Sequence, residues 1–237
     1  MAKELSNPVA SLISVPFQFN YDSGYGPSGS GKRTFMNLQP VVPISLGDNW
    51  NLISRTIIPL IDQQDFVPGT SQNGIGDIVQ SLFLSPKQPT KGGLIWGVGP
   101  AFLLPTGGNT LGADQFAAGI TGVVLKQSGP WTYGGLANHL WDVGKGSGST
   151  DISTTFVQPF LSYTTPDAWT FTLNSETTYD WIRKDTALPV NFVVTKLVNI
   201  GDQPVSIGAG VRYWADSTTN GPDGWGARLV LTFLFPK

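Results

Sequence analysis

The chain has 237 residues, of which 13% are charged, about half of the roughly 25% that is usual for globular proteins. Its net charge of −2 provides no basic surface for a polyanion, so we expect no nucleic-acid partner. Cysteine is absent and His139 is the single histidine, which excludes disulfide and thiolate chemistry and disfavours a histidine metal site. We therefore expect no metal and no cofactor.

The hydropathy pattern and the N-terminus bear on the cellular location. No run approaches the ~18 apolar residues that a membrane-spanning helix requires. Residues Met1–Leu5 also lack the apolar stretch of a secretory signal peptide. The features described below favour the bacterial outer membrane, so we expect that a signal peptide has been removed and that Met1 was added.

In chain order, apolar and polar residues alternate over a series of segments, which predicts strands whose two faces meet different surroundings. These segments are 15–22, 33–43, 50–61, 76–85, 94–104, 117–127, 130–141, 153–164, 168–180, 188–199, 204–214 and 224–235. Mostly short connections, at 44–49, 86–93, 128–129, 165–167 and 200–203, alternate with longer ones at 23–32, 62–75, 105–116, 142–152, 181–187 and 215–223.

This rhythm of short and long connections is typical of outer-membrane barrels, which have short periplasmic turns and longer extracellular loops. We therefore predict an all-β protein that forms a single twelve-stranded antiparallel transmembrane β-barrel. A soluble β-sandwich is the alternative, because its strands also alternate. Prolines inside the predicted strands each remove a ladder donor, so we expect bulges or local gaps at Pro40, Pro43, Pro59, Pro100, Pro159 and Pro189.

The last predicted strand shows the two faces most clearly. One face carries Trp225, Leu229, Leu231, Phe233 and Phe235, and the other carries Gly226, Arg228 and Thr232. Segment 168–181 repeats the pattern, with aromatic residues toward both of its ends. An apolar band flanked by aromatic residues is what a lipid-facing barrel surface requires.

If Trp169 and Leu229 face lipid, the same parity sends the charged and amide side chains of the strands into the lumen. An arginine facing lipid at mid-membrane would cost about 2–4 kcal/mol, so pairing inside the barrel is expected. The inward set that we predict to line the lumen and contact substrate is Phe35, Asn37, Gln39, Arg55, Leu136, Asn138, Phe156, Gln158, Phe160, Asn174, Glu176, Asp180, Asn191, Arg212 and Arg228. A purely structural network that braces the barrel is the alternative interpretation of the charged members.

Several strings resemble a known family when they are taken together and in order. They are NPVASLISVPFQFNYD at 7–22, WNLISRTIIPLI at 50–61, GIGDIVQSLFLSP at 74–86, WGVGPAFLLPT at 96–106, SETTYDW at 175–181 and LFPK at 234–237. With matching spacing from Asn7 to Lys237, they resemble the outer-membrane channel family called the meta-pathway of phenol degradation proteins.

The resemblance implies a lumenal N-terminal plug over 1–14, a barrel over 15–237, and passive uptake of small hydrophobic compounds. It implies no catalysis, and the expected partners are outer-membrane lipid and small hydrophobic ligands. We expect a monomer. A disordered N-terminal tail is the alternative to the plug.

Two other functions stay open at this point. One is a general diffusion pore for small polar solutes. The other is a lipid-modifying barrel enzyme, because parity places His139 on the outer face near the extracellular rim. A phospholipase would be expected to have a serine two residues further on in the same strand, where this chain has Trp141. We therefore predict no catalytic residue.

Overall fold

The computed structural model describes residues 1–143 and 151–236. It contains the short helices α1 (Ala2–Leu5) and α2 (Gly108–Leu111). The strands are β1 (Ile13–Tyr25), β2 (Gly31–Leu38), β3 (Val41–Leu46), β4 (Trp50–Gln64), β5 (Ser71–Ile75), β6 (Ile78–Pro86), β7 (Leu94–Leu104), β8 (Ala117–Ser128), β9 (Trp131–Asp142), β10 (Ser153–Thr164), β11 (Trp169–Ser175), β12 (Thr177–Asp180), β13 (Asp185–Ile200), β14 (Gln203–Asp216) and β15 (Gly224–Phe235).

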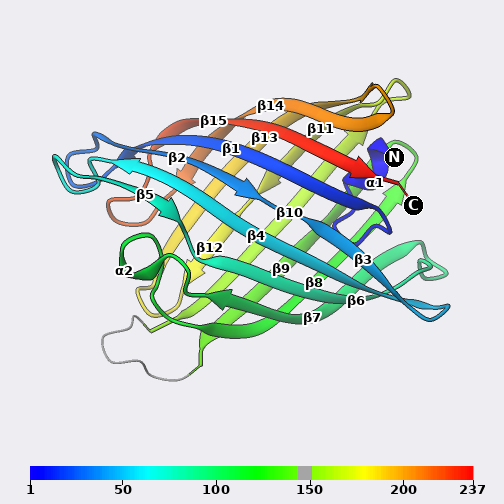
Figure 1. Ribbon diagram of the computed structural model, residues 1–237, viewed down its shortest axis with the longest axis horizontal. Helices are drawn as coiled ribbons and strands as arrows, with labels where there is room; N and C mark the ends of the chain where they lie inside the picture. Colours follow the sequence, from blue (N-terminus) through cyan, green and yellow to red (C-terminus); the bar gives the residue numbers. More distant parts are fainter. Residues whose placement is uncertain (144–150, 237) are drawn as a thin grey trace.

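The strands form one antiparallel sheet that closes on itself (Figure 1). The last strand, β15, pairs with the first, β1, from Ile13 opposite Phe235 to Tyr21 opposite Ala227. Three neighbouring pairs of segments, β2 with β3, β5 with β6 and β11 with β12, are each one interrupted barrel strand. The predicted closed twelve-stranded barrel is therefore confirmed.

The predictions of single uninterrupted strands over 33–43 and 168–180 are wrong in detail, and proline is the reason in both places. Pro40 separates β2 from β3, where the amide of Thr56 still donates to the Pro40 carbonyl at 3.1 Å. Glu176 separates β11 from β12 opposite Pro189, whose carbonyl accepts from the Glu176 amide at 3.3 Å. Segment 62–75, predicted as a loop, contains β5. The expected loop over 142–152 lies partly outside the described residues.

The other prolines show that the wall bulges without opening. Pro43 and Pro159 keep their ladder partners. Pro59 accepts from the Gly76 amide at 2.8 Å. Pairing between β6 and β7 is interrupted beside Pro100, but the backbones stay in contact there, because a Cβ on Gly99 would collide with the Leu82 carbonyl oxygen.

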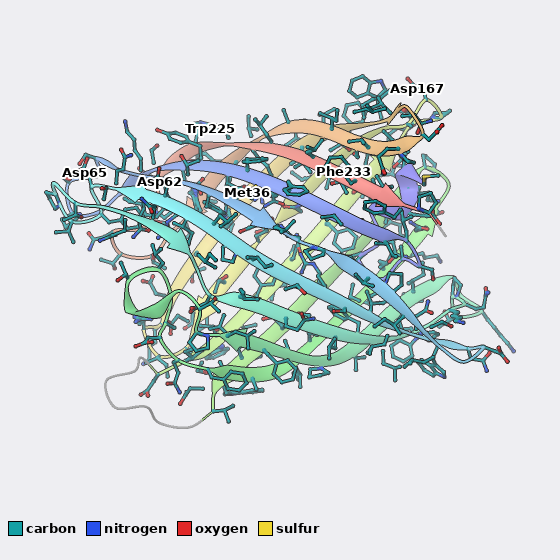
Figure 2. All side chains as sticks on the ribbon, in the orientation of Figure 1. Met36, Asp62, Asp65, Asp167, Trp225 and Phe233 are labelled. Atoms are coloured by element: carbon teal, nitrogen blue, oxygen red, sulfur yellow. The ribbon has the colours of Figure 1, made fainter. Side chains whose placement is uncertain are left out.

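The two ends of the barrel differ. Both termini and the short connections lie at one end, which we call the terminal end, and the longer connections lie at the other, the loop end (Figure 1). Asp62 and Asp65 lie at the loop end and Asp167 at the terminal end (Figure 2). The Thr165 hydroxyl donates to the Asp167 carboxylate at 2.6 Å and holds the pKa of Asp167 below its ordinary value.

The outer surface is apolar and carries aromatic residues toward both ends. At the terminal end, Trp50 packs edge-on against Trp96, and at the loop end Tyr213 lies against Trp225 with ring centroids 5.0 Å apart. Polar outward groups satisfy one another: Thr56 donates to Gln80 at 2.6 Å, and Gln80 donates to Ser54 at 3.1 Å. Among the described residues, none of the helices has the length and hydropathy needed to cross a bilayer.

The N-terminal segment contacts the inner wall of the barrel at the terminal end. Val9 is buried in a cluster with Ile53, Phe83, Val123, Leu125 and Leu136, which are inward residues of four strands. Ala10 and Leu12 pack against Leu234. The Lys3 ammonium donates to the Gly129 carbonyl at 2.6 Å, and the Asn51 amide donates to the Ser11 hydroxyl at 2.8 Å. The N-terminal segment therefore lies against the inner wall of the barrel at its terminal end.

This arrangement predicts a depth-dependent cost for outward charge. Ala209 faces outward near the middle of β14, and Ala118 faces outward at the loop end, opposite Trp141. We expect Ala209→Arg to lower the free energy of unfolding in lipid vesicles by about 2–4 kcal/mol, and Ala118→Arg by about 0–1 kcal/mol. Urea titration followed by tryptophan fluorescence measures both. Equal losses in the two variants would contradict the assigned outer face.

Candidate functional site in the barrel lumen

A charge network from three widely separated parts of the chain lies on the inner wall. Arg228 on β15 donates two hydrogen bonds to the carboxylate of Glu176, both at 2.8 Å. Its Nε donates to the side-chain oxygen of Asn20 on β1 at 2.7 Å. Arg228 is only 2% exposed, and two parallel bonds to one carboxylate are the strongest geometry that a guanidinium makes. This pair anchors the network.

Arg212 on β14 extends the network toward Asp22. Its guanidinium nitrogens lie 3.7 Å from Asp22 and 3.7 Å from Glu176. It lies over the Trp214 ring at 4.5 Å, and the Trp214 indole donates to Asp22 at 3.0 Å. Asp22 is fully buried, and a Cβ on Gly226 would collide with its carboxylate. Glycine at position 226 is therefore needed for the close approach of β15 to this carboxylate.

Amide side chains continue the polar wall toward the terminal end. Arg55 on β4 donates to the Gln39 side-chain oxygen at 2.9 Å, and the Gln39 amide lies 3.4 Å from that of Gln18. Asn191 on β13 donates to Asn174 on β11 at 2.8 Å. Within residues 1–143 and 151–236, no carboxylate lies within 4.0 Å of Arg55.

A cavity of about 270 Å³ lies between the N-terminal segment and this polar wall. Leu136, Phe160 and Val193 supply much of its apolar lining, together with Leu5 and Leu12 of the N-terminal segment. Arg55, Arg228, Gln39, Gln158 and Asn174 supply polar groups. The cavity is thus amphipathic, with the charged side chains on one part of the wall.

The residues predicted from sequence to line the lumen occupy inward register positions, but only some of them border this cavity. Those that do are Gln39, Arg55, Leu136, Gln158, Phe160, Asn174 and Arg228. Glu176, Arg212, Asn191 and Phe35 belong to the network or lie beside it, with the Arg212 guanidinium 5.8 Å from the Phe35 ring. Phe156 packs on the buried cluster around Val9. In the strand register, Asn37 lies opposite Gln18 and Asn138 lies opposite Phe156. Asp180 lines a second cavity of about 340 Å³ at the loop end.

Sequence reasoning missed Asp22 and Trp214, which complete the network. Asp22 has the same parity as Gln18 and Asn20, so the alternation of the first strand contained the signal. Trp214 also has inward parity, opposite to the outward Tyr213 beside it. Its inward position would have indicated a polar partner for the indole, because a buried indole N–H needs an acceptor.

The outer face carries a separate polar group at the loop end. The His139 Nδ1 lies 2.7 Å from the Thr155 hydroxyl, which accepts a hydrogen bond from the Trp181 indole at 2.8 Å. The His139 ring lies 4.1 Å from that of Trp141. The described residues contain no group of three or more His, Cys, Asp or Glu side chains placed to hold a metal ion.

No protein-family model matches this sequence, and no curated protein sequence matches it. Solved structures do match. The COG4313 outer membrane channel from Pseudomonas putida F1 is similar over 95% of this chain and 96% of its own, with 17% identity and a TM-score of 0.68. Outer membrane phospholipase A from Escherichia coli is similar over 94% and 96%, with 11% identity and a TM-score of 0.57. The β domain of the Bordetella autotransporter BrkA is similar over 95% and 100%, with 11% identity and a TM-score of 0.53. At these identities the likeness establishes the fold, that of an outer-membrane β-barrel.

The network geometry predicts a large effect of removing its central carboxylate. Glu176→Gln leaves two buried guanidiniums without their shared partner, and breaking a buried ion pair on one side costs about 3–5 kcal/mol. We expect the free energy of unfolding to fall by that amount in a urea titration. Asp167→Asn is the control, because this exposed carboxylate lies 3.7 Å from Lys196 at the barrel rim, and no measurable loss is expected. Equal stability of the two variants would show that the network does not brace the barrel.

Proposed function

We propose that the protein is an outer-membrane channel for the passive uptake of small hydrophobic compounds. The observation that carries the proposal is the cavity of about 270 Å³ with apolar walls of Leu136, Phe160 and Val193 and a few orienting amides. Sites for small ligands are mostly apolar with a small number of placed polar groups. The structural similarity to an outer membrane channel supports the same role.

The proposed route runs from the loop end to the terminal end. A compound enters at the second cavity near Asp180 and Arg183, passes the charge network, and rests beside Phe160. It then leaves past the N-terminal segment at the terminal end. No motor is part of this mechanism, so movement follows the concentration gradient.

We infer further that the chain belongs to the family of meta-pathway of phenol degradation proteins that its sequence strings resemble. The proposal includes residence in the bacterial outer membrane after removal of a signal peptide, contact with outer-membrane lipid, and a monomeric state. The apolar outer face with aromatic residues at both ends supports the membrane location.

A general diffusion pore is the weaker alternative. A pore of that kind needs a continuous aqueous passage, whereas Val9 here packs against inward side chains of four strands at the terminal half. The hydrogen bonds of Lys3 and Ser11 hold the same segment against the wall. The buried apolar cluster around Val9 therefore favours selective passage over bulk diffusion of polar solutes.

Uptake by whole cells tests the proposed function, because an intact lipopolysaccharide leaflet retards hydrophobic compounds. We expect Gram-negative cells that express the protein to take up radiolabelled toluene several-fold faster than cells with an empty vector. Val193→Trp, which fills the cavity, should abolish the gain. Val194→Trp, the same change on the next residue and on the lipid face, should retain it.

Two outcomes would contradict this proposal. One is toluene uptake that is the same in both tryptophan variants. The other is porin-like permeation of arabinose in a liposome swelling assay with the purified wild-type protein, which would indicate a diffusion pore.

The outer-face group allows a test of the enzyme alternative. A hydroxyl beside an imidazole is the minimal pair for nucleophilic catalysis, and one structural neighbour is named a phospholipase. However, the Thr155 hydroxyl also accepts from the Trp181 indole, and Trp141 occupies the position expected for a serine. We expect no release of fatty acid from fluorescent phosphatidylethanolamine above background by the wild-type protein. Hydrolysis that is lost in both His139→Ala and Thr155→Ala would establish an enzyme.

A further inference from the structure

The charges on the inner wall are unequal in number. Arg55, Arg212 and Arg228 face the two carboxylates of Asp22 and Glu176. Other charged groups near the lumen lie at its ends. At the loop end, Asp180 is paired with Arg183, and Arg33 donates to the neutral amide of Gln63 at 2.6 Å. At the terminal end, the exposed Glu4 also borders the cavity, but it is paired with the N-terminal amino group at 3.0 Å. The middle of the lumen therefore carries an excess of positive charge.

Beside the cavity, the excess falls on Arg55. Both oxygens of Glu176 accept from Arg228, and Arg212 lies between Glu176 and Asp22. The partner of Arg55 is the neutral amide of Gln39, at 2.9 Å. Arg55 is half-buried and shares the field of Glu176 with two other arginines, but no carboxylate in the described residues lies within 4.0 Å of it. An anion that binds directly beside such a guanidinium lowers the cost of its partial desolvation.

Arg55 also borders the amphipathic cavity. The same cavity is lined by Leu136, Phe160 and Val193, so a ligand can contact a guanidinium and an apolar wall at once. The planar fork of arginine matches a carboxylate, and apolar side chains match a ring or a short hydrocarbon chain. At about 270 Å³ the cavity is just below the ~300–1,000 Å³ of sites for drug-sized ligands, which limits the ligand to about one ring.

We propose that the cavity binds small hydrophobic carboxylates, with the carboxylate on Arg55 and the hydrocarbon against Leu136, Phe160 and Val193. This inference rests on the proposed uptake function and names its substrate class as anionic. It distinguishes Arg55 from Arg212 and Arg228, whose charges are already matched by carboxylates of the protein. Neutral hydrophobic compounds of the same size bind more weakly.

Calorimetric titration of the purified protein in detergent at neutral pH tests the inference, with benzoate and its neutral analogue benzamide as probes. We expect benzoate to bind at least ten-fold more tightly than benzamide. Arg55→Gln should weaken benzoate binding at least ten-fold and leave benzamide binding unchanged. Lys91→Gln, which removes an exposed cation from a short turn outside the lumen, is the control and should change neither affinity.

A conservative variant keeps the test decisive if Arg55→Gln does not fold, as judged by heat-dependent mobility on a gel. Arg55→Lys keeps the charge but loses the planar fork, so we expect a several-fold loss of benzoate affinity and none for benzamide. Equal benzoate affinity in the wild type and in the folded Arg55 variant would overturn the inference.

The outcomes also separate this inference from the proposed function. If benzoate and benzamide bind equally to the wild type, while Val193→Trp still blocks toluene uptake, the channel function stands and the anionic substrate class falls. If neither probe binds and Val193→Trp leaves toluene uptake unchanged, both are overturned.

Discussion

The closed wall imposes one constraint on which the other features depend. Each strand residue faces either lipid or the lumen, and a charged side chain at mid-membrane destabilises the barrel unless it faces the lumen. The outward-facing lysines agree with this constraint because they lie near the end of the barrel. Lys126 and Lys196 face outward, but both lie close to the short turns at the terminal end. The Lys196 ammonium lies 5.0 Å from the Trp169 ring centroid and donates to the Asp167 carbonyl, so its charged head is at the membrane boundary.

The charged side chains inside the narrow lumen contact one another, so they hold strands together in addition to setting the chemistry of the lumen. Arg228 joins β15 to β1 through Asn20, and Arg212 joins β14 to β1 through Asp22. These contacts cross the seam where the first and last strands meet. They add side-chain links to the backbone pairing that closes the barrel there. The bracing role is therefore compatible with the proposed binding role, because the two are assigned to different arginines. Arg228 also borders the cavity, but it and Arg212 are matched by carboxylates, whereas Arg55 borders the cavity with a neutral amide as its direct partner.

Alternation with a period of two assigns inward register positions to the predicted lumenal residues, although the inward Asp22 and Trp214 were not singled out. Glu176 and Asp180 keep their parity across the interruption between β11 and β12, since both segments pair with β10 in one register. Local alternation does not predict which residue each inward side chain contacts. Asn20 and Arg228 are 208 positions apart and meet only after the barrel closes. Irregularity at Pro40 and Pro189 was expected from the missing proline donors, but the division into separate segments was not, because a strand with one missing donor has the same alternation as an intact strand.

The N-terminal segment determines which part of the lumen can hold a ligand. It packs Val9 against β4, β6, β8 and β9, and this fills one side of the terminal half. The cavity adjoins this cluster, since Leu136 belongs to both and Phe160 packs against the cluster, and it extends to Arg55 and Val193. The hydrogen bonds of Lys3 and Ser11 contribute about 0.5–1.5 kcal/mol each, so apolar burial of Val9, Ala10 and Leu12 supplies most of the attachment. A hydrophobic ligand in the cavity would offer the same apolar wall an alternative partner, and competition between ligand and segment for that wall is a physical means of release toward the terminal end.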